Sequence, residues 1–197
     1  MVALPAPRQP TVDAIWRVYE SAADSDPRPH LGASVIGREC SRALWYSFRW
    51  ATRERHSGRL LRLFQRGQGE EAQFVADLRA AGVGVYDVDP RTKRQFTYAD
   101  VGGHFGGSMD GCALGLVEAP KKWHVLEFKT HNAKSFKALV AKGVEKTKPE
   151  HAAQMQMYMH WSGMDRAFYL AVNKDTDELY SERLKYDKTM ALALVEK

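Results

Sequence analysis

Apolar residues recur every three to four positions in the first part of the chain, as on one face of an α-helix. This spacing predicts helices at 11–23, 35–50 and 58–81. Ser34 precedes the second helix as a candidate N-cap, and Gly82 is placed to end the third. Gly67 and Gly69 fall inside the third helix and weaken its intrinsic helix propensity.

From residue 82 onward apolar and polar residues alternate, which is the period of a half-buried β-strand. The alternation predicts strands at 82–89, 94–100, 103–111, 123–130, 165–174 and 179–187. Helical spacing returns at 133–143, 148–163 and 188–197, and Pro149 and Gly163 are placed to begin and end the middle one. This order predicts an α/β (α+β) domain with a central mixed β-sheet flanked by helices.

Length and composition narrow the class of protein. A chain of 197 residues suits a single domain with a sizeable core. It has no apolar run long enough to span a membrane and no N-terminal signal-peptide pattern, so we expect a cytoplasmic protein with no membrane partner. The two cysteines, Cys40 and Cys112, form neither a disulfide framework nor a zinc-ligand spacing.

Positive charge is concentrated in two tracts. The net charge is +5; arginines are dense between Arg38 and Arg66, and lysines are dense between Lys121 and Lys148. Two basic tracts suit a surface that holds the phosphates of a nucleic acid. A pair of solvated helical faces explains the same charges, and charge alone favours that simpler explanation.

Candidate chemistry lies in the run "VLEFK" and in the turn "SMDG" that precedes it. In a strand, Glu127 and Lys129 project from one face, while Leu126 and Phe128 project from the other and anchor the strand in the core. Asp110 ends the preceding predicted strand. Pairing between the two strands would therefore bring Asp110 beside Glu127.

Two carboxylates that converge on one point repel each other, and a divalent cation relieves the repulsion. Oxygen-only ligands select Mg²⁺ or Mn²⁺, and a lysine beside such an ion suits phosphodiester hydrolysis. Each piece is weak alone, because about one Glu-x-Lys match is expected in a chain of this length and Asp-Gly is a common hairpin turn. For Glu127 and Lys129 the alternative is a surface pair on an edge strand.

The helix predicted at 148–163 adds two polar side chains to this set. Gln154 and Tyr158 lie four residues apart, so they share one helix face. The methionines and alanines of the same helix also suit a core helix with both polar side chains at its edge.

Four patches in this order resemble the PD-(D/E)XK nuclease superfamily, and in particular its RecB-like and phage lambda exonuclease-like branch: "RGQGEE", "GSMDG", "LEFK" and "AQMQMY". A fifth patch, "LGASVIGRECSR", is similar to the N-terminal helix entry of these nucleases. The resemblance implies a single nuclease domain over residues 1–197 with a restriction-endonuclease-like core. Within it, the N-terminal helical part would cover about 10–82 and the catalytic core about 83–197.

The resemblance implies roles for the residues of the strand and the turn. Asp110, Glu127 and the backbone carbonyl of Phe128 match the ligands of Mg²⁺ or Mn²⁺ in these nucleases. Lys129 matches their catalytic lysine.

The resemblance also extends to two helices. Glu71 matches the helical glutamate that completes the metal site, with the neighbouring Glu70 as the alternative register. Gln154 and Tyr158 match the QxxxY element that supports the active site and contacts DNA.

Serines and an arginine hold the DNA 5′-phosphate in the lambda-like branch. Ser34 and Ser108 match these serines, and Arg28 is the nearest arginine, although its spacing departs from the family pattern. Arg38 and Arg42, four residues apart on the predicted helix, are the substitutes for bidentate phosphate contacts.

Cys40 lies where some RecB-like nucleases place the first cysteine of an iron–sulfur cluster. The other three cysteines would follow the last predicted helix, in which this sequence ends. We therefore expect no cluster in this chain and a buried Cys40. None of the seven histidines is assigned as a metal ligand.

The leading hypothesis is a Mg²⁺-dependent deoxyribonuclease, an exonuclease of phage or prophage type that acts on DNA ends in recombination or repair. The resemblance implies DNA and a single-strand annealing protein as partners in the bacterial host cell, and it allows an oligomer. An endonuclease or flap nuclease is the alternative within the superfamily. A DNA-binding module that keeps the nuclease scaffold without turnover is the alternative from a different class.

Overall fold

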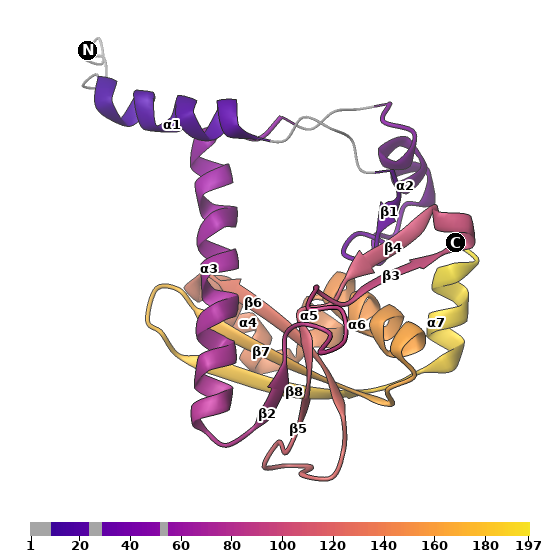
Figure 1. Ribbon diagram of the computed structural model, residues 1–197. Coiled ribbons are helices and arrows are strands. Elements are labelled where there is room, and N and C mark those ends of the chain that lie inside the picture. Colours follow the sequence, from indigo (N-terminus) through magenta and orange to yellow (C-terminus); the bar gives the residue numbers. More distant parts are fainter. Residues whose placement is uncertain (1–8, 24–28, 52–54) are drawn as a thin grey trace.

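The computed structural model describes residues 9–23, 29–51 and 55–197, which form helices and strands in mixed order (Figure 1). The helices are α1 (Pro10–Ala22), α2 (Ser41–Phe48), α3 (Gly58–Ala80), α4 (Ala133–Lys142), α5 (Val144–Thr147), α6 (Pro149–Ser162) and α7 (Lys188–Val195), with one 3-10 turn, η1 (Val101–Gly103). The strands are β1 (Leu31–Gly32), β2 (Gly84–Tyr86), β3 (Thr97–Asp100), β4 (Phe105–Ser108), β5 (Gly111–Leu114), β6 (His124–His131), β7 (Arg166–Asn173) and β8 (Leu179–Lys185). The predicted α/β (α+β) class is confirmed.

The strands are shared between two mixed sheets. The larger sheet has the order β2-β5-β6-β7-β8, in which only β6 and β7 are parallel neighbours. The smaller sheet has the order β1-β4-β3, with β1 parallel to β4. The segment predicted as one strand at 103–111 divides into β4 and the start of β5, which belong to different sheets. Asp110 therefore lies at the joint between the two sheets.

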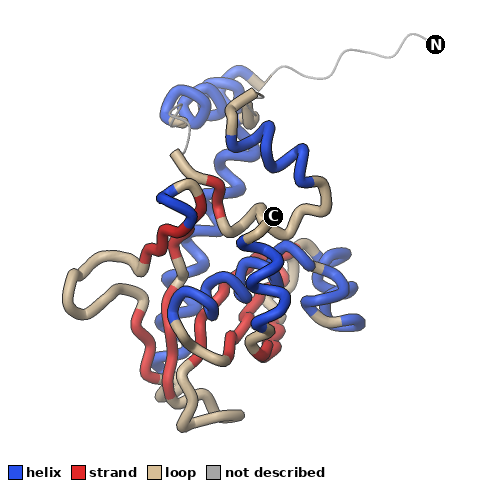
Figure 2. The backbone as a smooth tube through the Cα atoms, turned by 90° about the vertical axis from the view of Figure 1, so that its right-hand side faces the viewer, coloured by secondary structure: helices blue, strands red, loops and turns tan. Residues whose placement is uncertain are grey.

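The two faces of β6 belong to two separate hydrophobic clusters. Val125 packs in the cluster that contains the buried side chains of α6. Leu126 and Phe128 pack in the other cluster with α3, where the rings of Phe74 and Phe128 stack at 5.1 Å. Helices accordingly lie on both sides of the large sheet (Figure 2). The predicted anchoring of this strand by Leu126 and Phe128 is confirmed.

The two long helices end at the glycines that the sequence indicated. Gly82 follows α3 with a φ of +84°, and Gly163 follows α6 with a φ of +74° and donates its N–H to the carbonyl of Met159 at 3.0 Å. L-side chains rarely adopt such φ values, so glycine favours the stop. α3 nevertheless continues through Gly67 and Gly69, because packing of an amphipathic face outweighs intrinsic propensity.

The helix predicted at 35–50 begins only at Ser41, and this prediction was wrong over its first two turns. The cause is long-range pairing. Leu31 and Ala33 donate their backbone N–H groups to the carbonyls of His104 and Gly106, both at 2.8 Å, which extends the chain beside β4. Ser34 lies exposed in the turn that follows and does not cap α2.

A close approach to α6 holds this turn in place. A Cβ added to Gly37 would lie 2.6 Å from the Cα of Glu150 and 2.9 Å from the Cβ of Ala153. Only glycine fits there without a backbone shift. The N-terminal segment is thereby packed against the first turn of α6.

We predict that Gly37→Ala destabilises the protein by about 1–3 kcal/mol, because the added methyl group meets backbone atoms of α6. Gly69→Ala is the matched control. A Cβ there meets nothing within 4 Å, and alanine in a helix interior is favoured over glycine by about 0.5–1 kcal/mol. Urea unfolding followed by circular dichroism measures both, and equal stabilities of the two variants would contradict the packing argument.

Candidate active site

The candidate site lies along an edge of β6, at the point where its pairing with β5 stops. β5 pairs with β6 as far as Gly111 opposite Leu126, whereas β7 stays paired with β6 as far as His131. Beyond Leu126 no strand of the described residues covers the β5 side of β6. Asp110 takes the next place there, because its Oδ2 accepts a hydrogen bond from the backbone N–H of Phe128 at 2.8 Å.

Glu127 and Lys129 project from the same face of β6, as the alternation predicted. The Nζ of Lys129 donates to Oε1 of Glu127 and, at 3.2 Å, to the backbone carbonyl of Phe128. Glu127 is fully buried, and its Oε2 has no hydrogen-bond partner among the described residues. A buried carboxylate oxygen left in this state costs free energy. The geometry therefore suits the uptake of a further group at Oε2.

The electrostatics of the site show an excess of negative charge. The pKa of Glu127 is raised to about 8: burial is the largest cause, Asp110 and Glu71 also raise it, and Lys129 lowers it. Burial also raises the pKa values of Asp110 and Glu71. Burial lowers the pKa of Lys129, but Glu127, Asp110 and Glu71 outweigh that effect and leave it above its usual value. Three carboxyl groups therefore share one ammonium group.

Glu71 reaches this cluster from α3. It is half-buried, and its strongest charged partners are Asp110 and then Lys129. α3 runs close to β6 at this point, since a Cβ on Gly67 would lie 3.9 Å from Oγ1 of Thr130. Of the two α3 glutamates that the sequence left open, Glu71 is the one coupled electrostatically to Glu127.

The QxxxY pair on α6 holds the turn before Asp110. Tyr158 donates its hydroxyl hydrogen to the carbonyl of Ser108 at 2.6 Å, and Gln154 donates to the Tyr158 hydroxyl at 3.3 Å. A Cβ on Gly107 would lie 2.9 Å from that hydroxyl, so the turn needs a residue without a side chain there. Gln154 and Tyr158 are both buried, which makes them supports of the turn in this structure.

Comparison with solved structures identifies the fold. LHK-Exo, an alkaline exonuclease from Laribacter hongkongensis, matches with a TM-score of 0.57 and 18% identity over 91% of this chain and 91% of that one. Its complex with dAMP matches with a TM-score of 0.60 and 18% identity over 92% of this chain and 86% of that one. The chain shares the fold of this alkaline exonuclease.

A further structure and the sequence comparisons complete this finding. The protein SSO0001 matches with a TM-score of 0.52 and 14% identity over 94% of this chain and 84% of that one. No protein-family model and no curated protein sequence matches the chain. The likeness to solved structures thus rests on three-dimensional arrangement and not on close sequence identity.

The residues at the edge of β6 are chemically suited to the hard divalent cation that the sequence resemblance implies. The described residues contain no group of three or more His, Cys, Asp and Glu side chains placed together as metal ligands. Asp110, Glu127 and the Phe128 carbonyl instead offer a small set of oxygen atoms, one of them the unpaired Oε2 of Glu127. Mg²⁺ commonly takes one or two carboxylates and fills its other positions with water and phosphate.

The residues assigned to phosphate by resemblance lie in the N-terminal segment and the turn of the nuclease fold. Ser34 and Ser108 are exposed, and Arg42 is exposed on α2. Arg38 is half-buried and precedes α2, so the prediction that it shares a helix face with Arg42 was wrong. Arg28 lies outside the described residues.

Two other expectations concern Cys40 and membrane association. The expectation of a buried Cys40 was wrong, because this residue is exposed where the chain enters α2, whereas Cys112 is buried. Within the described ranges, no helix has the length and apolar character needed to cross a bilayer.

A buried hydrogen-bond network beside the site was not found from the sequence. Tyr169 lies opposite Glu127 in the β6–β7 register, and its hydroxyl group contacts Nε2 of His131 at 2.8 Å and Nδ1 of His151 at 3.0 Å. The sequence offered only a tyrosine in an apolar strand and two isolated histidines. Their convergence depends on parallel pairing of β6 with β7, which no local pattern reveals.

We predict that His151→Gln changes how stability depends on pH. Burial lowers the pKa of His151 to about 3, below its value of about 6.5 in the unfolded chain, so the unfolded state binds the extra proton between these values. This histidine therefore lowers the free energy of unfolding by about 2 kcal/mol as the pH falls from 7 to 5. The stability of the wild type relative to the variant should fall by that amount.

Urea unfolding at pH 7 and pH 5 measures the effect. The exposed His104, changed to Gln, is the control, and its difference from the wild type should stay constant. A pH-independent difference for His151→Gln would show that the imidazole is not held neutral in the fold.

Proposed function

We propose that this protein is a metal-dependent deoxyribonuclease that hydrolyses DNA phosphodiester bonds, with an exonuclease as the favoured mode. The observation that carries the proposal is the convergence of Asp110, Glu127 and Lys129 at the open edge of β6. The nuclease fold supports the same reading. A surface pair on an edge strand, which was the alternative for Glu127 and Lys129, does not account for a fully buried Glu127.

Asp110, Glu127 and the Phe128 carbonyl would hold Mg²⁺ or Mn²⁺. When bound, such an ion polarises the phosphate and makes an attacking water more acidic. Lys129 would orient that water with its ammonium group and stabilise the negative charge that develops on the phosphate oxygens. Asp110 and Glu127 are fixed before substrate arrives, one by the Phe128 N–H and the other by Lys129.

Three further side chains would support this centre. Glu71 would add negative charge that strengthens cation binding. Tyr158, held by Gln154, fixes the carbonyl of Ser108 and with it the turn that presents Asp110. We assign these two α6 residues to positioning, since both are buried.

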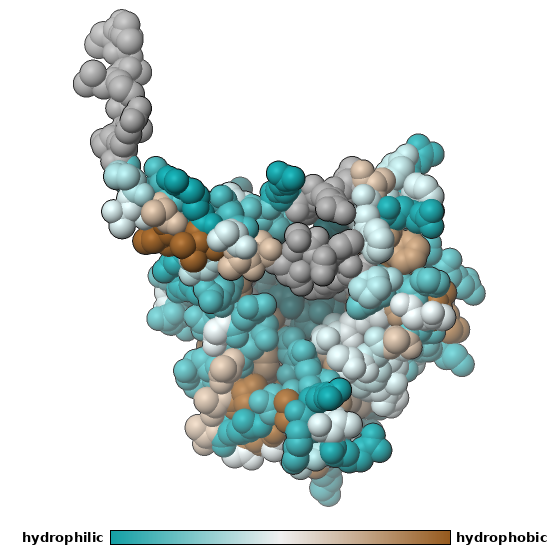
Figure 3. Space-filling model, turned by 45° about the horizontal axis from the view of Figure 1, so that its top comes forward, coloured by the Kyte–Doolittle hydropathy of each residue, from teal (hydrophilic) through white to brown (hydrophobic). Residues whose placement is uncertain are grey.

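DNA would enter over a polar surface. The face seen in Figure 3 is hollowed at its centre, and the surface in the hollow is mostly hydrophilic. Phosphate contacts are proposed for the exposed Ser34, Ser108 and Arg42 and for the half-buried Arg38. Arg28 is proposed as a phosphate contact on the sequence resemblance alone.

The biological setting is proposed from the fold comparison and the sequence resemblance. The alkaline exonuclease fold supports an exonuclease. The sequence resemblance is the basis for proposing action on DNA ends in recombination or repair, in the cytoplasm of a bacterial host of a phage or prophage. A single-strand annealing protein is the proposed partner, and oligomer formation is compatible with this role.

The first experiment measures release of nucleotides from end-labelled duplex DNA with Mg²⁺ and with EDTA. We expect hydrolysis only with the metal. Asp110→Asn and Lys129→Ala should each lower the rate about 100-fold or more, because each removes a charge placed for the reaction. Lys185→Ala, an exposed lysine on the far edge strand β8, should leave the rate unchanged.

Three outcomes would decide between the alternatives. Cleavage of closed circular DNA would favour an endonuclease over an exonuclease. Salt-dependent DNA binding without Mn²⁺ binding by calorimetry would favour an inactive binding module. Hydrolysis that persists in EDTA or in Lys129→Ala would reject the proposed mechanism.

A second test separates the neighbouring glutamates of α3. We expect Glu71→Gln to weaken Mn²⁺ binding and to slow hydrolysis by about tenfold or more, because it removes a carboxylate coupled to Asp110 and Glu127. Glu70→Gln is the matched control and should change both quantities less than about twofold. Titration calorimetry and the nuclease rate measure the pair, and a larger effect at Glu70 would reverse the assignment.

A further inference from the structure

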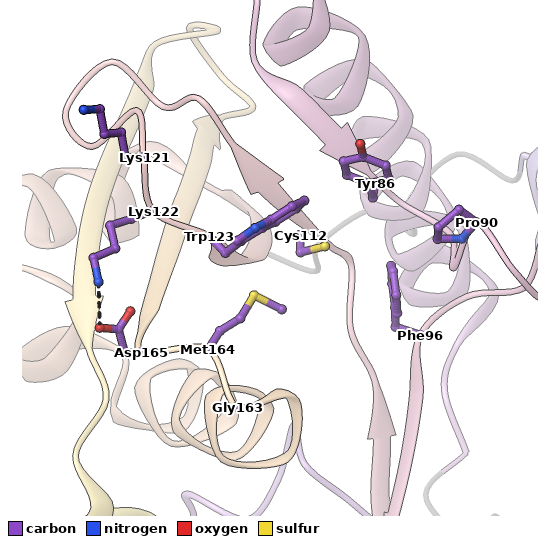
Figure 4. A pocket seen from close by; sticks show the side chains of 10 residues that line it. All are labelled: Tyr86, Pro90, Phe96, Cys112, Lys121, Lys122, Trp123, Gly163, Met164 and Asp165. Carbon is purple, nitrogen blue, oxygen red and sulfur yellow. Dashed lines mark hydrogen bonds and ion pairs between the residues drawn. The ribbon is translucent and has the colours of Figure 1, made fainter.

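A second concave surface lies beyond the start of β6, away from the carboxylate cluster. Its volume is about 730 Å³, and the lining includes Trp123, Tyr86, Phe96 and Lys122. Figure 4 shows Trp123 between an edge that carries Lys121 and Lys122 and an edge formed by Tyr86 and Phe96. No residue of the proposed active site is part of this lining.

Two of these aromatic rings are unusually accessible. Trp123 is 41% exposed and Tyr86 is 42% exposed, and their ring centroids lie 5.5 Å apart at an interplanar angle of 49°. Both side chains therefore expose aromatic surface on which a planar ligand could stack. Large exposed aromatic side chains gathered in a hollow commonly mark a binding site.

A second hollow lies beside the first, along the segment between β2 and β3. Its volume is about 680 Å³, and its lining includes Arg91, Arg94, Phe96 and Tyr98. Phe96 lines both hollows, so the two are neighbours. We call the two hollows together the aromatic groove.

The charge around the aromatic groove is positive. The nearby acidic side chains already have basic partners: Asp165 pairs with Lys122 at 3.5 Å and with Arg166 at 3.2 Å, and Asp89 pairs with Arg91 at 3.6 Å. Arg94 and Lys121 add further positive charge to the lining. Aromatic faces between basic side chains suit a ligand that carries both planar bases and phosphates.

The aromatic groove lies on the same face of the large sheet as the carboxylate cluster. The side chain of Cys112 lines the groove, and it packs in the same core cluster as its β6 neighbour Val125. Val125 and Glu127 share a face of β6, and Trp123 precedes Glu127 by four residues, or about 13 Å of extended chain. A strand of nucleic acid bound in the groove would thus be within a short distance of the proposed site.

We propose that the aromatic groove binds single-stranded DNA, with bases stacked on Trp123 and Tyr86 and phosphates held by Lys121 and Arg94. The choice of DNA rests on the proposed nuclease function. Unpaired bases expose faces that can stack on aromatic side chains, whereas the bases of a duplex are already stacked on one another. The groove would hold an unpaired strand beside the end at which the nuclease acts.

The test measures fluorescence anisotropy of a labelled 20-nucleotide single strand in EDTA, so that it is independent of cleavage. Trp123→Ala should weaken binding about tenfold, and Trp123→Phe, which keeps a ring, should restore most of the affinity. The double variant Lys121→Gln/Arg94→Gln should lower the slope of log affinity against log salt by about 1.4. Lys185→Gln/Lys188→Gln, on β8 and α7, is the charge-matched control and should keep the wild-type slope.

Each of three results would overturn the proposal. In the first, the wild type binds no single strand in EDTA. In the second, Trp123→Ala binds as tightly as the wild type while its thermal unfolding is unchanged. In the third, a blunt duplex of equal length binds as tightly as the single strand, which would reveal a general basic surface. Loss of nuclease activity in the Mg²⁺ assay is a separate result that tests the proposed function alone.

Discussion

A buried carboxylate that is only half paired constrains the rest of this structure. Glu127 is fully buried, Lys129 holds its Oε1, and Oε2 has no hydrogen-bond partner within the described part of the chain. Such a group lowers stability unless its surroundings fix it and a further group satisfies it. Leu126 and Phe128, on either side of it in sequence, are packed against α3 in a separate core cluster. β6 is therefore held rigid at the place where a reaction needs fixed geometry.

The joint between the two sheets supplies the second carboxylate. The turn before Asp110 is held by Tyr158, whose hydroxyl group binds the Ser108 carbonyl, and Asp110 itself is held by the N–H of Phe128. Gly107 permits the close approach of the Tyr158 hydroxyl. The small sheet, α6 and β6 thus all fix the same three-residue turn, and a change in any one of them would move Asp110.

Local sequence patterns predicted the features that local interactions determine. The alternation in β6 correctly predicted that Glu127 and Leu126 lie on opposite faces of the strand. Gly82 and Gly163 correctly predicted where the two long helices end. Features that depend on distant residues were not predicted. The division of 103–111 between two sheets has no local signal, because both parts alternate in the same way. The helix predicted at 35–50 was shortened by pairing with β4, which lies more than 60 residues away in sequence.

In the candidate site, too, local sequence patterns identified the residues, whereas their interactions depend on contacts between distant parts of the chain. Sequence motifs identified Asp110, Glu127 and Lys129. They did not show how the charges of these side chains balance in the folded protein. In the fold, burial raises the pKa values of Asp110, Glu127 and Glu71, and repulsion by neighbouring carboxylates adds to the rise at Glu127 and Glu71. Lys129 compensates only part of the charge of these three groups. Protonation and binding of a hard cation relieve the same excess of negative charge. The candidate ligand atoms of Asp110, Glu127 and the Phe128 carbonyl are all oxygen. The excess negative charge therefore favours a cation that prefers oxygen ligands.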